Sequence, residues 1–116
     1  MPKLINLDAP VVSLTGVKIV NPFKPRENLT LRAVFIAVCE FHKPQNPGSG
    51  EFLRAYKLGI KFLDAEQNQI ELEQEDIDFL KRIVPETSIF VSVIIGRTLD
   101  YLESIIGQKV DKIKSN

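Results

Sequence analysis

The chain has 116 residues, of which 44% are hydrophobic and 26% are charged, as is typical of one globular domain. Fifteen basic residues balance fifteen acidic ones, so the basic excess of a dedicated nucleic-acid binder is missing. The single cysteine, Cys39, excludes an internal disulfide, and neither a signal peptide nor an apolar run of membrane-spanning length is recognised, so we expect a soluble cytoplasmic protein with no membrane partner.

Two runs rich in β-branched residues lie near the start of the chain. Residues 11–20, VVSLTGVKIV, surround the pair Thr15 and Gly16, and this pattern predicts a β-hairpin. The next segment, 21–28, contains two prolines and is predicted to be a connector.

The segment 31–41 is apolar on nearly every side, and Thr30 precedes it as a suitable helix cap. We predict a helix, although the many β-branched and aromatic residues leave a buried strand as the alternative. Cys39 lies in this segment and is therefore expected to be buried and unreactive. The polar residues 43–50, KPQNPGSG, are predicted to be the most mobile internal loop, and His42 beside them is expected to be exposed.

A helix is predicted over 51–63, with two apolar faces and one basic stripe. Gly59 in its interior costs about 1 kcal/mol relative to alanine unless close packing offsets it. The basic stripe is the candidate anion surface of the chain. The first apolar face contains Leu53, Tyr56, Ile60 and Leu63, the surplus second face contains Phe52, Leu58 and Phe62, and the basic stripe contains Arg54, Lys57 and Lys61.

A partial calcium-loop pattern follows this helix. Its oxygen ligands would be Asp64, Glu66, Asn68 and Glu75. The position that needs glycine is Gln69, and the apolar position is displaced by one residue. We therefore interpret 64–75 as a polar connection that contains a short extended bridge, QIEL, and predict no metal site.

Two further helices are predicted. The first spans 73–84, because acidic residues stand in its first turn, basic residues in its last, and Pro85 follows. The second spans 88–106 after a cap at Thr87 or Ser88, although its β-branched start, 88–95, could instead form a strand. Residues 107–116 are predicted to be a frayed tail. The residues expected to face inward from the last helix are Val91, Ile94, Leu99, Leu102 and Ile106.

Four large apolar residues of the last helix fall off this inward stripe. Leaving such a side chain in water forgoes about 1.5–3 kcal/mol of burial free energy. We therefore predict that they form a contact with a second copy of the chain or with another protein. These predicted interface residues are Ile89, Phe90, Val93 and Ile105.

Sequence signatures of catalysis are missing: the chain has no GxSxG, P-loop, GxGxxG or HExxH motif. His42 has no nucleophile or carboxylate nearby in the sequence that would support a role as a base. We therefore predict a protein that is not an enzyme, with no catalytic residues and no cofactor.

Five segments occur in an order that resembles a group of small proteins encoded by tailed phages and prophages. The segments are LINLDAPVVSLTG, TLRAVFIAV, LRAYKLGIKF, IELEQEDIDFLKRIV and GRTLDYLE, and together they span roughly residues 4–103. The resemblance implies a phage context, a bacterial host cytoplasm and an accessory or assembly role. It carries no activity and no functional residues.

These observations predict a single domain over 1–116 of the α+β class, with an N-terminal β-hairpin followed by about four helices around one core. The leading function hypothesis is a small non-enzymatic interaction or assembly protein that acts through an apolar helical face. The alternative is a nucleic-acid-binding regulator that uses the basic stripe, and a degenerate EF-hand-like calcium module is a third hypothesis.

Overall fold

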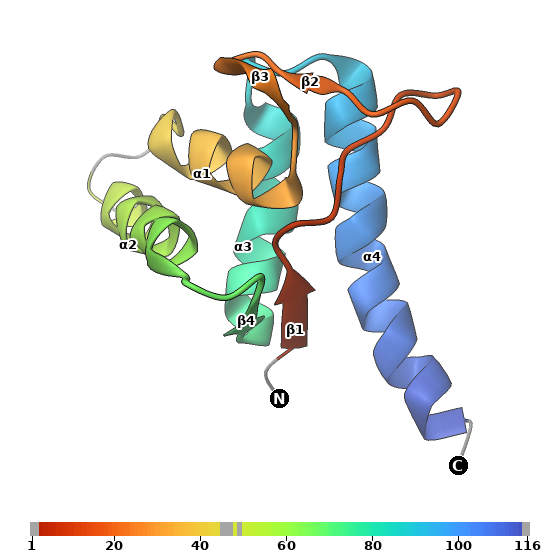
Figure 1. Cartoon of the computed structure of the whole chain (residues 1–116). Helices are drawn as coiled ribbons and strands as arrows, with labels where there is room; N and C mark the ends of the chain where they lie inside the picture. Colours follow the sequence, from red (N-terminus) through yellow and green to blue (C-terminus); the bar gives the residue numbers. More distant parts are fainter. Residues whose placement is uncertain (1–2, 45–47, 49, 115–116) are drawn as a thin grey trace.

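Figure 1 shows a computed structural model of the chain, in which residues 3–44, 48 and 50–114 are described, with side-chain surroundings given up to residue 105. In this described part, four α-helices pack with two small two-stranded antiparallel sheets, which confirms the α+β class. The helices are α1 (Leu31–Glu40), α2 (Glu51–Asp64), α3 (Gln74–Ile83) and α4 (Ser92–Lys114). The strands are β1 (Lys3–Asn6), β2 (Val20–Asn21), β3 (Lys24–Asn28) and β4 (Gln69–Leu72).

The first sheet joins segments that lie far apart in the sequence. β1 pairs antiparallel with β4, in a register that aligns Ile5 with Ile70 and Lys3 with Leu72. Ile5 and Leu72 are fully buried, so the burial of one side of this sheet fixes the register. The prediction that the sheet is simply an N-terminal hairpin is therefore wrong, because β1 finds its partner after α2.

The predicted hairpin at 11–20 is present as a turn whose two arms pair irregularly, with the Ile19 N–H donating to the Val11 carbonyl at 3.0 Å. The Ser13 N–H donates to the Val17 carbonyl at 2.8 Å, and Gly16 adopts a positive φ of 87° in the turn. An isolated bridge joins Val12 to Lys18, but no strand forms there. The second sheet, β2 with β3, occupies the segment predicted to be a connector; β3 is exposed along its length, and such an edge tolerates its proline.

Helix α1 confirms the helical prediction for 31–41 and excludes the strand. The Thr30 hydroxyl accepts a hydrogen bond from the Ala33 N–H at 3.3 Å, as an N-cap should. α1 packs against α2, and a Cβ added at Gly59 would lie 3.2 Å from the Cys39 Cβ. Glycine is therefore used at this position because the two helices approach closely.

Helix α3 confirms the prediction for 73–84, with Ile77 and Leu80 fully buried. Pro85 follows in a short 3₁₀ helix, Val84–Glu86, which turns the chain toward α4.

Helix α4 is helical from Ser92, so the strand alternative for 88–95 is wrong and the helix begins four residues after the predicted start. Thr87 and Ser88 precede it by too far to cap it. Val91, which was predicted to face inward, is 65% exposed. The helix continues to Lys114, so the described part of the predicted frayed tail, 107–116, is helical, and residues 115–116 lie outside the described residues.

Long side chains tie these elements together. Arg32 of α1 donates to the carbonyls of Ala65 at 2.7 Å and Gln67 at 2.9 Å, so it holds the segment that leads from α2 into β4. Arg97 of α4 donates to the Ser13 carbonyl at 2.8 Å. The Tyr101 hydroxyl accepts a hydrogen bond from the Asn6 N–H at 2.6 Å.

None of the helices in the described part of the chain combines the length and apolar character needed to span a bilayer.

Candidate functional site

Helix α2 has three distinct sides, because its sequence places apolar residues over more than half of its circumference. The side that contacts α1 contains Ala55, Leu58 and Phe62, all buried. Phe62 is fully buried and stacks on Phe35 of α1, with ring centroids 5.0 Å apart. Two of the three residues predicted for the surplus second face, Leu58 and Phe62, are therefore the ones that enter the core.

The first predicted apolar face of α2 points to solvent together with Phe52. We call these five residues the α2 outer face. Their exposed fractions are 56% for Phe52, 46% for Leu53, 64% for Tyr56, 37% for Ile60 and 60% for Leu63. In Figure 1, α2 lies at the edge of the molecule with α1 beside it, and α1 is the element with which α2 makes its main contacts. The described structure thus leaves a continuous apolar stripe without a partner.

A shallow depression separates the outer face from α3. It measures about 510 Å³, and its lining includes Leu53, Lys57 and Phe79. Phe79 is 6% exposed, and the guanidinium carbons of Arg54 and Arg82 lie 5.2 Å and 5.3 Å from its ring centroid. Both distances are within the range of cation–π attraction, so the aromatic ring orders the two guanidinium groups.

The predicted anion surface, Arg54, Lys57 and Lys61, lies along one border of the outer face. Arg54 donates to the Asp76 carboxylate at 3.1 Å and is thus partly neutralised. Within the part of the chain that the structure describes, neither Lys57 nor Lys61 has an ion pair. The two lysines are therefore available to an external acidic group.

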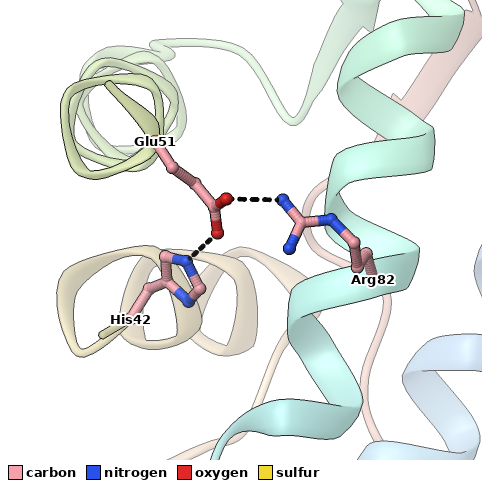
Figure 2. Close-up of polar contacts among 3 residues, drawn as sticks. All are labelled: His42, Glu51 and Arg82. Atoms are coloured by element: carbon pink, nitrogen blue, oxygen red, sulfur yellow. Dashed lines mark hydrogen bonds and ion pairs between the residues drawn. The ribbon is translucent and has the colours of Figure 1, made fainter. Parts of the chain in front are cut away.

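The segment that follows α1, helix α2 and helix α3 meet at Glu51, the first residue of α2 (Figure 2). One carboxylate oxygen contacts His42 Nε2 at 2.5 Å, and the other accepts from Arg82 at 3.0 Å. The Arg82 hydrogen bond and then the His42 hydrogen bond hold the pKa of Glu51 below its usual range. The cluster therefore fixes the start of α2 against the end of α1 and against α3.

This cluster corrects the prediction for His42. Its side chain is only 4% exposed, and its ring packs edge-on against Phe79, with centroids 6.0 Å apart. The sequence hid this arrangement because Glu51 is nine residues away and beyond a polar loop. Half of the predicted mobile loop, residues 45–47 and 49 of 43–50, lies outside the described residues.

Two of the four residues predicted to form an interface on the last helix are buried within the chain, and two are partly exposed. Phe90 is 7% exposed and Ile105 is 4% exposed, and both belong to the core. Ile89 and Val93 are partly buried and pack against that core. The reason for predicting an interface there, that these side chains have no place inside the subunit, does not hold for Phe90 and Ile105.

The remaining candidate residues show no arrangement typical of a metal or nucleophile site. Among the described residues, no group of three or more His, Cys, Asp or Glu side chains could hold a metal ion, and this includes Asp64, Glu66 and Glu75. Cys39 is buried as predicted, and burial raises the pKa of its thiol to about 12. A thiol with this pKa is almost entirely protonated at neutral pH and is a poor nucleophile.

Comparison of the chain with models of known protein families, with curated proteins and with solved structures gave no match. Its function is therefore inferred from its own residues.

Proposed function

We propose that this protein is a small non-enzymatic interaction protein and that the α2 outer face is the surface through which it binds another protein. The observation that carries this proposal is the continuity of the five exposed apolar side chains on one side of one helix. Isolated exposed apolar residues are ordinary, whereas a contiguous apolar stripe usually belongs to an interface.

The energetics of α2 support this assignment. Complete burial of a fully exposed large apolar side chain gains about 1.5–3 kcal/mol, and the side chains of the outer face, which are roughly half exposed, would gain about half of that each. The buried side of the same helix already anchors it through Leu58 and Phe62, so the outer face is not needed for folding. A helix held in this way presents a preorganised surface to a partner, which lowers the entropy lost on binding.

The surface differs from the one predicted from the sequence, but the type of function is the same. An apolar helical face is still the interacting surface, and it lies on α2 instead of α4. A phage or prophage context, with an accessory or assembly role in a bacterial cytoplasm, is proposed from the order of the sequence segments alone. The nucleic-acid alternative is less favoured, because apolar residues outnumber basic ones on this surface and Arg54 is paired with Asp76.

Site-specific photo-crosslinking in the organism that carries the gene tests the proposal. A photoreactive residue replaces Tyr56 or Leu63 of the outer face, and Leu14, which is 85% exposed in the turn before Gly16, is the control position. We expect one discrete adduct from positions 56 and 63 and none from position 14, with loss of the adduct in a Leu53→Asp background. Equal labelling at all three positions, or no adduct at 56 and 63, would contradict the proposal.

A further inference from the structure

We infer that the partner binds through an acidic amphipathic helix, with its apolar side on the α2 outer face and its carboxylates along the basic border. This inference rests on the proposed function and specifies the chemistry of the partner.

The three sides of α2 follow one another in a fixed order around the helix. At about 100° per residue, the outer face occupies an arc of roughly 100°, with Phe52 at one limit and Leu53 at the other. The next arc contains Lys57, Lys61 and Arg54, and the buried arc completes the circle. The basic residues therefore border the outer face along one edge only. A helix that packs on this face would place one of its own flanks over that edge.

The charges along this edge favour an acidic flank. The lysine ammonium groups of Lys57 and Lys61 have no ion pair in the described structure, although the chain as a whole has no net charge. Asp64, one turn beyond Lys61, is the carboxylate at the C-terminal end of this border. The positive character is therefore concentrated in the first three turns of α2, and a partner with carboxylates opposite these turns would gain electrostatic complementarity.

The depression beside Leu53 provides a defined place for such a carboxylate. Three of its lining residues are cationic, Arg54, Lys57 and Arg82, and one, Glu51, is acidic. The guanidinium groups of Arg54 and Arg82 rest against Phe79 and already pair with Asp76 and Glu51, so Lys57 is the lining cation without an ion pair in the described structure. A partner carboxylate in the depression would therefore pair with Lys57, beside two guanidinium groups that are already ordered.

The dimensions of the outer face match a helix of moderate length. From Phe52 to Leu63 the face extends roughly 17 Å, or about three helical turns. A second copy of the chain fits less well, since two-fold antiparallel pairing of two outer faces would place both basic borders on the same side. A membrane surface fits less well too, because the basic residues border one edge only, whereas an interfacial helix presents a whole polar face rich in lysine and arginine.

A displayed library of helical peptides tests this inference with the full-length protein as the target. Each peptide has about 16 residues, roughly 24 Å of helix, with fixed apolar positions and flanking positions that vary among Glu, Gln and Lys. We expect selection to enrich peptides with Glu along one flank. The double charge reversal Lys57→Glu/Lys61→Glu should weaken their binding about tenfold or more, whereas Lys24→Glu, an exposed reversal on β3, should leave it unchanged.

The possible results separate this inference from the proposed function. Equal enrichment of Gln-, Lys- and Glu-flanked peptides that all lose binding in Tyr56→Asp would overturn the acidic partner but retain the docking face. Absence of any peptide that distinguishes the wild type from Tyr56→Asp would overturn the acidic helix, and the crosslinking experiment then decides the docking face independently. Tyr56-dependent binding to phosphatidylglycerol vesicles without peptide enrichment would assign the face to membranes. Tyr56-dependent dimers in sedimentation would assign it to a second copy.

Discussion

Helices α2 and α4 both contain more apolar residues than one side of a helix can hold. The additional apolar side chains are buried around α4 but exposed on α2. Around α4, the surrounding elements cover the additional side chains, and Phe90 before it and Ile105 within it are buried. Around α2, only the side that faces α1 is covered, and five large apolar side chains remain exposed.

The difference arises from position and not from composition. α4 contacts β1, α3 and the 3₁₀ helix Val84–Glu86, and Phe23 packs edge-on against Phe90 with centroids 6.2 Å apart. α2 lies at the edge of the molecule (Figure 1). An apolar excess therefore becomes core where several elements meet and becomes a candidate binding surface where one element packs alone.

Aspartate substitutions at one apolar residue near α4 and one on α2 should differ strongly in their effect on stability. Phe90→Asp should destabilise the protein by about 5 kcal/mol, comparable to the whole stability of a small domain, because it removes a buried ring and introduces a buried carboxyl. Tyr56→Asp on the outer face should change the free energy of unfolding by less than about 1 kcal/mol. Urea unfolding followed by circular dichroism measures both. A folded Phe90→Asp variant with a lower mass in light scattering would instead place Phe90 in an interface.

Two adjacent residues of α2, one buried and one exposed, allow the same test within a single helix. Phe62→Ala should cost about 3–5 kcal/mol, because Phe62 is fully buried and the substitution leaves a cavity beside Phe35. Leu63→Ala should cost less than about 0.5 kcal/mol, because Leu63 is 60% exposed. Chemical denaturation under identical conditions provides both values. Similar losses for the two variants would show that α2 is rotated relative to the arrangement described.

One glycine in α4 and one in α2 provide a smaller test, because their substitution by alanine is expected to change stability in opposite directions. Gly96→Ala in α4 should stabilise the protein by up to about 1 kcal/mol, because a Cβ there meets nothing within 4 Å and alanine has the higher helix propensity. Gly59→Ala in α2 should instead destabilise it by about 1 kcal/mol, because the new Cβ would lie 3.2 Å from the Cys39 Cβ and crowd α1. Thermal unfolding of both variants gives the two signs, and a stabilised Gly59→Ala would argue against close contact between α1 and α2.

A still smaller change in stability is expected with pH, through Glu51 at the start of α2. Because Arg82 and His42 lower the folded-state pKa of Glu51 below its ordinary value of 4.5, the folded protein binds fewer protons there than the unfolded chain. The contribution of Glu51 to stability is therefore complete above pH 4.5 and is lost as the pH falls through the folded-state pKa. Melting temperatures measured between about pH 3 and 7 should show a smaller acid-side decrease for Glu51→Gln than for the wild type. If the melting temperatures of the wild type and the variant fall equally at low pH, Glu51 does not contribute to the pH dependence of stability.

Most of the helix positions could be predicted from the amino-acid sequence, because the signals that mark a helix are local. Thr30 caps α1 by accepting a hydrogen bond from the Ala33 N–H, three residues away, and the acidic first turn and basic last turn of α3 favour that helix through its own dipole. Gly16 likewise marks a real turn, since its positive φ is a property of a single residue. The start of α4 was predicted less well, because residues 88–91 provide no cap that acts locally.

The way in which these elements pack against one another could not be predicted from local signals. The pairing of β1 with β4 and the contacts of Glu51 with His42 and Arg82 join residues whose separation in the chain gives no periodic signal. The same holds for the candidate site. A helix with apolar residues over most of its circumference has several sides that would gain similar free energy on burial. The contact with α1 determines which of these sides of α2 is buried. The outer face of α2 and its basic border are what that contact leaves exposed.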